Sequence, residues 1–133
     1  MNRQDLLERL ASLIASVERP HPVRVAIDGI DVAGKTTLAD ELVPSVERRG
    51  RTAIRAFVNG FHRSRIQRYR RGPDSPEGYY HDSFDYTALR AALLVPLGPG
   101  GDRRYRKEVF DYRSDSTVRG PIVTAQNDSV LLF

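Results

Sequence analysis

The stretch that decides the fold is "RVAIDGIDVAGKTTLADEL", which runs from Arg24 to Leu42. It opens with alternating β-branched residues, reaches Asp28-Gly29, and continues to Gly34-Lys35-Thr36-Thr37. The spacing matches the pattern G-x-x-x-x-G-K-[ST], in which the glycines let the backbone wrap closely around a phosphate group. We therefore interpret residues 29–37 as a phosphate-binding loop between a strand and a helix.

The positions of this loop have predicted roles in binding ATP. Successive backbone N–H groups would point at the phosphates, and the N-terminus of the following helix would add positive partial charge. Lys35 would reach the β- and γ-phosphates, and the hydroxyl of Thr36 would bind Mg²⁺. The predicted nucleotide-binding residues are Gly29, Ile30, Asp31, Val32, Ala33, Gly34, Lys35, Thr36 and Thr37.

The flanking patterns predict a βαβ unit. Apolar residues at helical spacing predict a helix over about 3–18, and the alternating run "VRVAID" predicts a strand over 23–28. A helix over 35–50 and a second strand over about 52–58 follow. This order implies a parallel sheet with a right-handed crossover, and hence an α/β fold.

The rest of the chain is less regular. We expect Pro44 to kink or interrupt the second helix and Gly50 to end it. Residues 59–82 are polar and rich in arginine, glycine and proline, which is typical of a functional or disordered loop. Helical spacing returns over 83–98, and "RRYRKEVFDYRSD" (103–115) is compatible with an edge hairpin.

Composition narrows the class of protein. The 133 residues have room for one domain, with 40% hydrophobic and 29% charged residues. Without cysteine the chain has no disulfide, thiolate metal site or cysteine nucleophile. The N-terminus lacks the apolar core of a signal peptide, and no apolar run approaches the ~20 residues of a membrane helix. We expect a cytoplasmic protein with no membrane partner.

Four segments carry a resemblance to a known family. They are "AIDGIDVAGKTTLADEL", "FVNGFHRSR", "RYRRGPDSPEGYYHDSFDYTALRAALLVPLGPGG" and "RRYRKEVFDYRSD". From about residue 22 onward the chain resembles the uridine kinase / phosphoribulokinase family of P-loop kinases, and especially small bacterial uridine kinase-like proteins. The resemblance implies a P-loop NTPase fold with three αβα layers around a parallel sheet.

The resemblance also implies an activity. Such kinases move the γ-phosphate of ATP to a hydroxyl of a small metabolite, which in uridine kinases is the 5′-hydroxyl of the ribose. The family carries an acid after the second strand, in a D-x-F-[YH] pattern, and this chain reads Asn59-Gly60-Phe61-His62 there. An amide orients a hydroxyl but does not accept its proton as a carboxylate does. We therefore assign catalytic positions to Lys35 and Asn59 and expect impaired activity.

The resemblance places further residues near the phosphate acceptor. His62 is either a substrate contact or a surface histidine. The five arginines between 63 and 71 are compatible with a nucleic-acid stripe, a solvated loop or the mouth of a substrate cleft. The predicted substrate residues are His62, Arg63, Tyr79, Asp82, Tyr112 and Arg113.

The last residues, "SVLLF" (129–133), have the composition of a buried strand. In the resembled family this Walker B strand precedes an acid that binds Mg²⁺ through water, followed by a lid, further helices and a strand. We therefore expect residues 1–133 to be one incomplete P-loop kinase-like domain, truncated at this strand. The loss of covering helices would expose an apolar face and favour a homo-oligomer.

Three functions remain open from the sequence. The first is an ATP- and Mg²⁺-dependent kinase of a small hydroxyl compound, with a nucleoside such as uridine preferred. The second is a nucleotide-binding protein without turnover, because Asn59 replaces the family's acid. The third, less favoured, is a nucleic-acid-binding module that uses the arginine cluster, at a net charge of +4.

Overall fold

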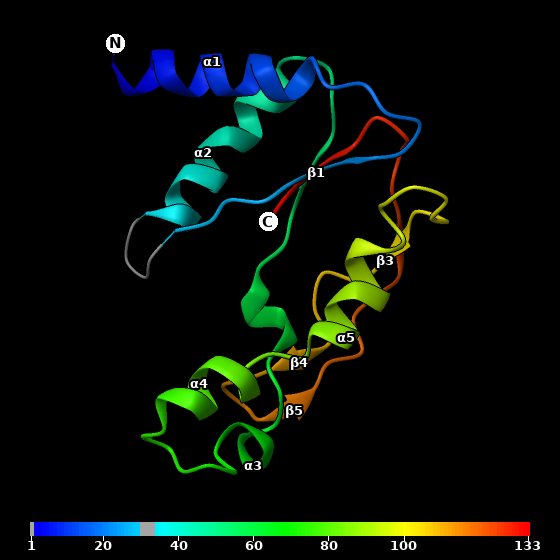
Figure 1. Ribbon diagram of the computed structural model, residues 1–133. Coiled ribbons are helices and arrows are strands. Elements are labelled where there is room, and N and C mark those ends of the chain that lie inside the picture. Colours follow the sequence, from blue (N-terminus) through cyan, green and yellow to red (C-terminus); the bar gives the residue numbers. More distant parts are fainter. Residues whose placement is uncertain (1, 30–33) are drawn as a thin grey trace.

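A three-stranded parallel sheet organises the chain (Figure 1), in a computed structural model that describes residues 2–29 and 34–133. Strand β7 (Val130–Leu132) lies in the middle, between β1 (Val23–Val25) and β2 (Ala53–Arg55). Both neighbours pair with β7 in the same register, first residue opposite first. The last segment of the chain is therefore inserted between the two strands of the βαβ unit.

Backbone hydrogen bonds extend this pairing beyond the regular strands. The N–H of Ile27 donates to the carbonyl of Phe133 at 2.7 Å, and the N–H of Ala56 donates to that of Leu132 at 3.4 Å. The predicted strands over 23–28 and 52–58 are thus confirmed in place and direction, although their regular cores are shorter.

The prediction that the last strand exposes an apolar face is wrong. Val130, Leu131 and Leu132 each have 0% exposure, because helices cover both faces of the sheet and both edges of β7 are paired. A strand in the centre of a sheet needs side chains that are apolar on both faces, which accounts for the continuous run of apolar residues. This burial removes the reason for expecting a homo-oligomer.

One face of the sheet is covered by two helices. Helix α1 (Arg3–Ala15) packs against α2 (Lys35–Glu47), and both lie over the side of β7 that carries Val130 and Leu132 (Figure 1). The buried members of this cluster are Leu7, Ala11, Leu42, Val46, Val130 and Leu132.

The opposite face is covered by α5 (Tyr86–Leu89) and the π-helical turn η2 (Arg90–Leu94). Leu131 points to this side and packs with Phe61, Leu89 and Leu93, which are also buried. The sheet thus separates two apolar clusters, an arrangement that agrees with the expected αβα layers on a small sheet.

The first two helices follow the sequence closely. Helix α1 ends at Ala15, three residues earlier than expected. Helix α2 continues through Pro44, so of the predicted kink or interruption there, the interruption is wrong. Gly50 follows the helix with a φ of +84°, the left-handed conformation in which glycine carries no steric cost, and its N–H donates to the carbonyl of Glu47.

Residues 59–82 are folded, so the disordered alternative for this segment is wrong. They hold part of η1 (Val58–Phe61), a 3₁₀ turn, followed by α3 (Arg65–Arg68) and α4 (Pro76–Asp82). The side chains of Ser64 and Ser75 cap α3 and α4 by accepting backbone N–H bonds. The short helices are too brief to show periodicity, which is why the sequence does not reveal them.

The C-terminal half differs from the expected hairpin over 103–115. Strand β3 (Arg104–Tyr105) pairs with β6 (Val123–Thr124), and β4 (Phe110–Asp111) pairs with β5 (Ser116–Thr117). The predicted hairpin is thus split between two small antiparallel sheets. In Figure 1, β4 and β5 lie near α3 and α4, at a distance from α1 and α2. Of the helices in residues 2–29 and 34–133, none combines the length and apolarity of a bilayer crossing.

The central position of β7 predicts a large cost for truncating Leu131. Leu131→Ala should lower the free energy of unfolding by about 3 kcal/mol, because it leaves a cavity in a close-packed core. Leu13→Ala, at a position 62% exposed on α1, should change it by less than about 0.5 kcal/mol. Urea unfolding followed by circular dichroism measures both, and equal small effects would contradict the packing described.

Candidate functional site

The phosphate-binding loop leads directly into α2. Gly34 is the residue before the helix and has a φ of +87°, a conformation that side chains rarely adopt. The ammonium of Lys35, in the first turn, donates to the carbonyl of Gly29 at 2.7 Å and so links the two ends of the loop. The helix N-terminus and this cation together provide a site for an anion.

Part of the predicted loop lies outside the described residues. Ile30, Asp31, Val32 and Ala33 belong to this part, whereas Gly29, Gly34, Lys35, Thr36 and Thr37 are described. The carboxylate of Asp28 accepts the N–H of Gly29 at 2.8 Å and marks the start of the loop.

Lys35 and Thr36 open onto a pocket of about 550 Å³, which we call the loop-side pocket. Its wall continues from the segment after β1, at Asp28, to the segment after β2, at Phe57 and Asn59. This pocket exists because β1 and β2 are both parallel to β7, so their carboxyl ends meet at the same edge of the sheet.

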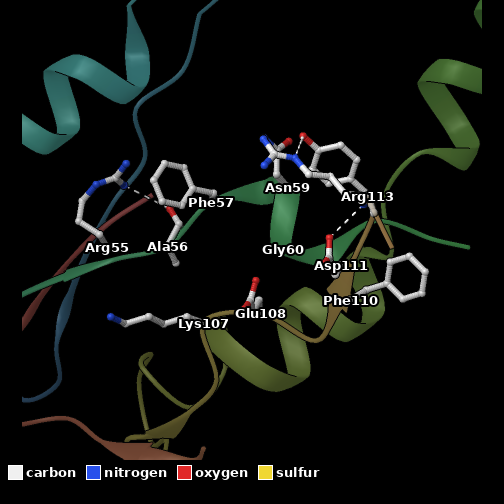
Figure 2. Close-up of a pocket in the computed structure, with 11 residues that line it drawn as sticks. Arg55, Ala56, Phe57, Asn59, Gly60, Lys107, Glu108, Phe110, Asp111 and Arg113 are labelled. Carbon is white, nitrogen blue, oxygen red and sulfur yellow. Dashed lines mark hydrogen bonds between the residues drawn. The ribbon is translucent and has the colours of Figure 1, made fainter. Parts of the chain in front are cut away.

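A second pocket of about 610 Å³ lies beyond Asn59 (Figure 2), and we call it the β4-side pocket. The two pockets share the wall made by Arg55, Ala56, Phe57 and Asn59. The other side of the β4-side pocket comes from β4 and the residues around it. These are Lys107, Glu108, Phe110, Asp111, Tyr112 and Arg113.

Gly60 allows the β4 side of this pocket to approach η1 closely. A Cβ added at Gly60 would lie 2.6 Å from the Cβ of Glu108, closer than side-chain atoms approach one another. The N–H of Val109 donates to the carbonyl of Gly60 at 2.9 Å and fixes the contact. The glycine that follows Asn59 therefore lets the β4 segment lie against η1.

Arg55 is held in place by several partners. Its guanidinium donates to Asp40 at 3.0 Å and to the carbonyl of Leu132 at 2.6 Å, and it lies 4.2 Å from the centre of the Phe57 ring. A cation fixed at the end of β2 gives the shared wall a positive charge without the entropy cost of ordering a free side chain.

Arg113 and Asp111 line the β4-side pocket from the β4 segment (Figure 2). The Arg113 guanidinium donates to the hydroxyl of Tyr112 at 3.3 Å. The backbone N–H of Arg113 donates to the carboxylate of Asp111 at 2.9 Å, which is the main cause of the lowered pKa of Asp111. Asp111 is therefore an ionised acceptor at neutral pH.

The predicted substrate residues fall into two groups. Tyr79 lines the loop-side pocket, and Tyr112 and Arg113 line the β4-side pocket. His62 and Arg63 are not among the residues that line either pocket. The Nε of Arg63 instead donates to the carbonyl of Phe84, which ties η1 to the end of α4.

His62 lies between two aromatic rings that face the two pockets. Its ring centre is 4.7 Å from that of Phe84, in the loop-side pocket, and 4.6 Å from that of Tyr112, in the β4-side pocket. Burial, reinforced by the nearby Arg68 charge, lowers the pKa of His62, so the ring is neutral at pH 7. The histidine therefore supports the walls of both pockets.

Asp82, also predicted as a substrate residue, lines neither the loop-side pocket nor the β4-side pocket. Its side chain is 1% exposed and accepts from Arg70 at 2.6 Å, and Arg71 lies 3.3 Å away. The Arg70 hydrogen bond is the main reason that the pKa of Asp82 is lowered. The buried carboxylate joins the arginine-rich segment to the end of α4 through these ion pairs.

Several pocket residues were missed in the sequence. Arg55 ends β2 and Phe57 lies two residues beyond it, so their position at the carboxyl end of a parallel strand was an available signal. Glu108 and Lys107 precede a short strand that pairs only locally, and no pattern in the sequence places them opposite Asn59.

Comparisons with known proteins agree with this geometry at the level of the fold. Neither the protein-family models nor the curated proteins contain a match to this chain. The chain is similar to a solved structure described as "Structure of a Possible Uridine Kinase from Bacillus stearothermophilus", with a TM-score of 0.80. The two share 20% sequence identity over 98% of this chain and 70% of that chain, so the likeness shows a P-loop kinase-like fold alone.

The ion pairs of Asp82 predict a pH-dependent contribution to stability. Because the pKa of Asp82 in the folded protein lies below its ordinary value, the pairs stabilise the fold above about pH 4. This stabilisation is lost as the pH falls through the lowered pKa. We expect Asp82→Asn to melt at a lower temperature than wild type at pH 7, with a gap that closes in acid.

The matched control for this measurement is Asp85→Asn. The Asp85 carboxylate caps α5 by accepting the N–H of Ala88 at 3.0 Å, and asparagine caps helices equally well. Thermal unfolding across pH 3–8 compares the three proteins. An Asp82→Asn variant that melts at the wild-type temperature at pH 7 would show that the buried pairs add no stability.

Proposed function

We propose that this protein transfers the γ-phosphate of ATP to a hydroxyl of a small metabolite, with a nucleoside such as uridine as the preferred acceptor. The observation that carries the proposal is the shared pocket. Lys35 and Thr36, at the phosphate-binding loop, line the same cavity as Asn59, at the position of the resembled family's acid. A donor phosphate and an acceptor hydroxyl would therefore meet within one pocket.

The donor side would bind through charge and backbone geometry. Lys35 would leave the carbonyl of Gly29 and pair with the β- and γ-phosphates, while the N-terminus of α2 stabilises the developing charge. Magnesium would bind chiefly to phosphate oxygens, which neutralises charge during transfer. Thr36 and Asp28 supply oxygen donors that line the same pocket and fit this ion.

Within residues 2–29 and 34–133, no three acidic or histidine side chains come together as a metal site of their own. This finding is compatible with an ion that arrives with the nucleotide, because Mg²⁺ commonly takes only one or two protein ligands.

Asn59 would orient the acceptor. Its amide oxygen would accept a hydrogen bond from the acceptor hydroxyl, while the proton itself leaves with water or phosphate. Phosphoryl transfer depends mainly on positioning and charge stabilisation, so an amide at this place supports slow transfer. The departure from a carboxylate favours a second candidate function, a nucleotide-binding protein with little or no turnover.

The acceptor would lie in the β4-side pocket. Phe57, Phe110 and Tyr112 offer aromatic faces on which a base stacks, and Arg113 and Asp111 offer a donor and an acceptor for its polar edge. These features support a nucleoside. Cytidine, pantothenate and ribulose phosphate are the competing acceptors to be compared with uridine in an assay.

The arginine cluster gives little support to nucleic-acid binding. Arg63 and Arg68 donate to backbone carbonyls, and Arg70 and Arg71 pair with Asp82. Four of the five arginines thus already have protein partners, which weakens the case for a row of phosphate contacts. The proposal is therefore a small-molecule enzyme of the cytoplasm.

Lys35→Ala tests the donor site. The substitution removes the only cation assigned to the β- and γ-phosphates, and we expect ATP affinity measured by calorimetry with Mg²⁺ to fall by about tenfold or more. Lys107→Ala is the control, because Lys107 is the other lysine of the chain and lines the β4-side pocket. Equal losses in the two variants, or none, would contradict the assignment of the loop.

Asn59→Asp tests the acceptor side. A carboxylate at this position gains the ability to accept the proton of the hydroxyl, so we expect turnover to rise by about a hundredfold or more. A coupled assay of ADP release with uridine, cytidine, pantothenate and ribulose phosphate reports the change. ATP binding without ADP release in both proteins would favour the nucleotide-binding alternative, and an Asp variant no faster than an active wild type would refute the role of this position.

A further inference from the structure

A third cavity lies against α1, beside the start of α2. It has a volume of about 540 Å³, and we call it the α1-side pocket. Its lining includes Gly34, Lys35 and Thr37 at the start of α2, and Arg3 and Leu6 of α1. Lys35 and Asp28 line both this cavity and the loop-side pocket, so a phosphate chain at Lys35 would lie between the two.

The wall that α1 provides is firmly attached to α2. The Nε of Arg3 donates to the carboxylate of Glu41 at 2.7 Å, at the mouth of the cavity. Further along the helix, the carboxylate of Glu8 accepts from Ser45 at 3.0 Å and from Arg49 at 3.2 Å. Leu7 and Ala11 are buried beneath these contacts. A wall held by packing and several ion pairs can define the shape of a binding site.

The lining combines an apolar surface with a polar edge. Leu6, Ile27 and Leu38 supply the apolar part, while Arg3 and Glu41 supply a donor and an acceptor. Leu6 remains 39% exposed although its neighbour Leu7 is buried. An aromatic base with a ribose needs both kinds of surface, and a phosphate group needs neither the leucines nor the isoleucine.

We infer that the α1-side pocket binds the base and ribose of the donor nucleotide, with Arg3 and Leu6 of the N-terminal helix as contact residues. This inference rests on the proposed function, in which the phosphates lie at Lys35 and the acceptor lies beyond Asn59. With the space on the Asn59 side assigned to the acceptor, the nucleoside part of the donor extends to the α1 side. Contacts with the N-terminal helix would then set the ratio between the affinity for a nucleotide and the affinity for a bare phosphate chain.

Two ligands distinguish the contribution of the nucleoside to binding from that of the phosphates. ATP carries both parts, and inorganic tripolyphosphate carries only the phosphate chain. Calorimetric titration with each probe, in the presence of Mg²⁺, therefore measures the contribution of the base and ribose as a ratio of affinities. The readout needs no catalysis.

We expect Leu6→Ala and Arg3→Ala each to weaken ATP binding by about fivefold and to change tripolyphosphate binding by less than about twofold. Leu13→Ala and Arg9→Ala are the matched controls, because they make the same changes on α1 at positions outside the cavity lining. Both controls should bind both probes as wild type does. Thermal unfolding of every variant verifies that α1 remains attached.

The titrations distinguish a failure of this inference from a failure of the proposed function. Unchanged ATP affinity in the Leu6 and Arg3 variants, or equal losses for ATP and tripolyphosphate, would overturn the inference and leave the phosphate site intact. A wild-type protein that binds neither probe would overturn the proposed function and this inference with it. If Arg3→Ala loosens the helix, the Leu6→Ala result decides, because Leu6 makes no ion pair and is partly exposed.

Discussion

The insertion of β7 between β1 and β2 is the constraint on which the rest of the structure depends. Both pairings are parallel, so the segments that follow β1 and β2 emerge at the same edge of the sheet. One of these segments is the phosphate-binding loop, and the other carries Asn59. Without β7 the two would have no fixed relation, because β1 and β2 do not pair with each other. The apolar run near the end of the chain thus positions a site whose residues lie far earlier in the sequence.

The central position of β7 also contributes to the stability of the fold. β7 buries Val130 and Leu132 against α1 and α2 and Leu131 against the η1–α5 side, so one strand joins two apolar clusters. The loop-side pocket opens at the edge of this core. Burial of the strand on both faces stabilises the fold, since apolar area removed from water contributes most to folding. The polar contacts of Arg55 then fix the wall of the pocket.

The sequence predicted the fold where local patterns and global topology agree. The loop from Gly29 to Thr36 has a motif with a physical mechanism, and the flanking strands and helix follow from period and propensity. The pairing partners in the C-terminal half were not predictable, because β3 to β6 are two residues each and their pairing is set by tertiary contacts. Asp82 illustrates a second limit, because a carboxylate beside arginines has the same sequence signature whether it binds a ligand or forms a buried ion pair.

In the proposed function a nucleotide would lie across the edge of the sheet, with its phosphates at the N-terminus of α2. A crystal structure with Mg²⁺ and a non-hydrolysable ATP analogue tests this claim most directly. We predict density for the triphosphate beside Lys35, the terminal phosphate facing Asn59, and the base against Arg3 and Leu6. A nucleotide bound away from Lys35 would contradict the central claim.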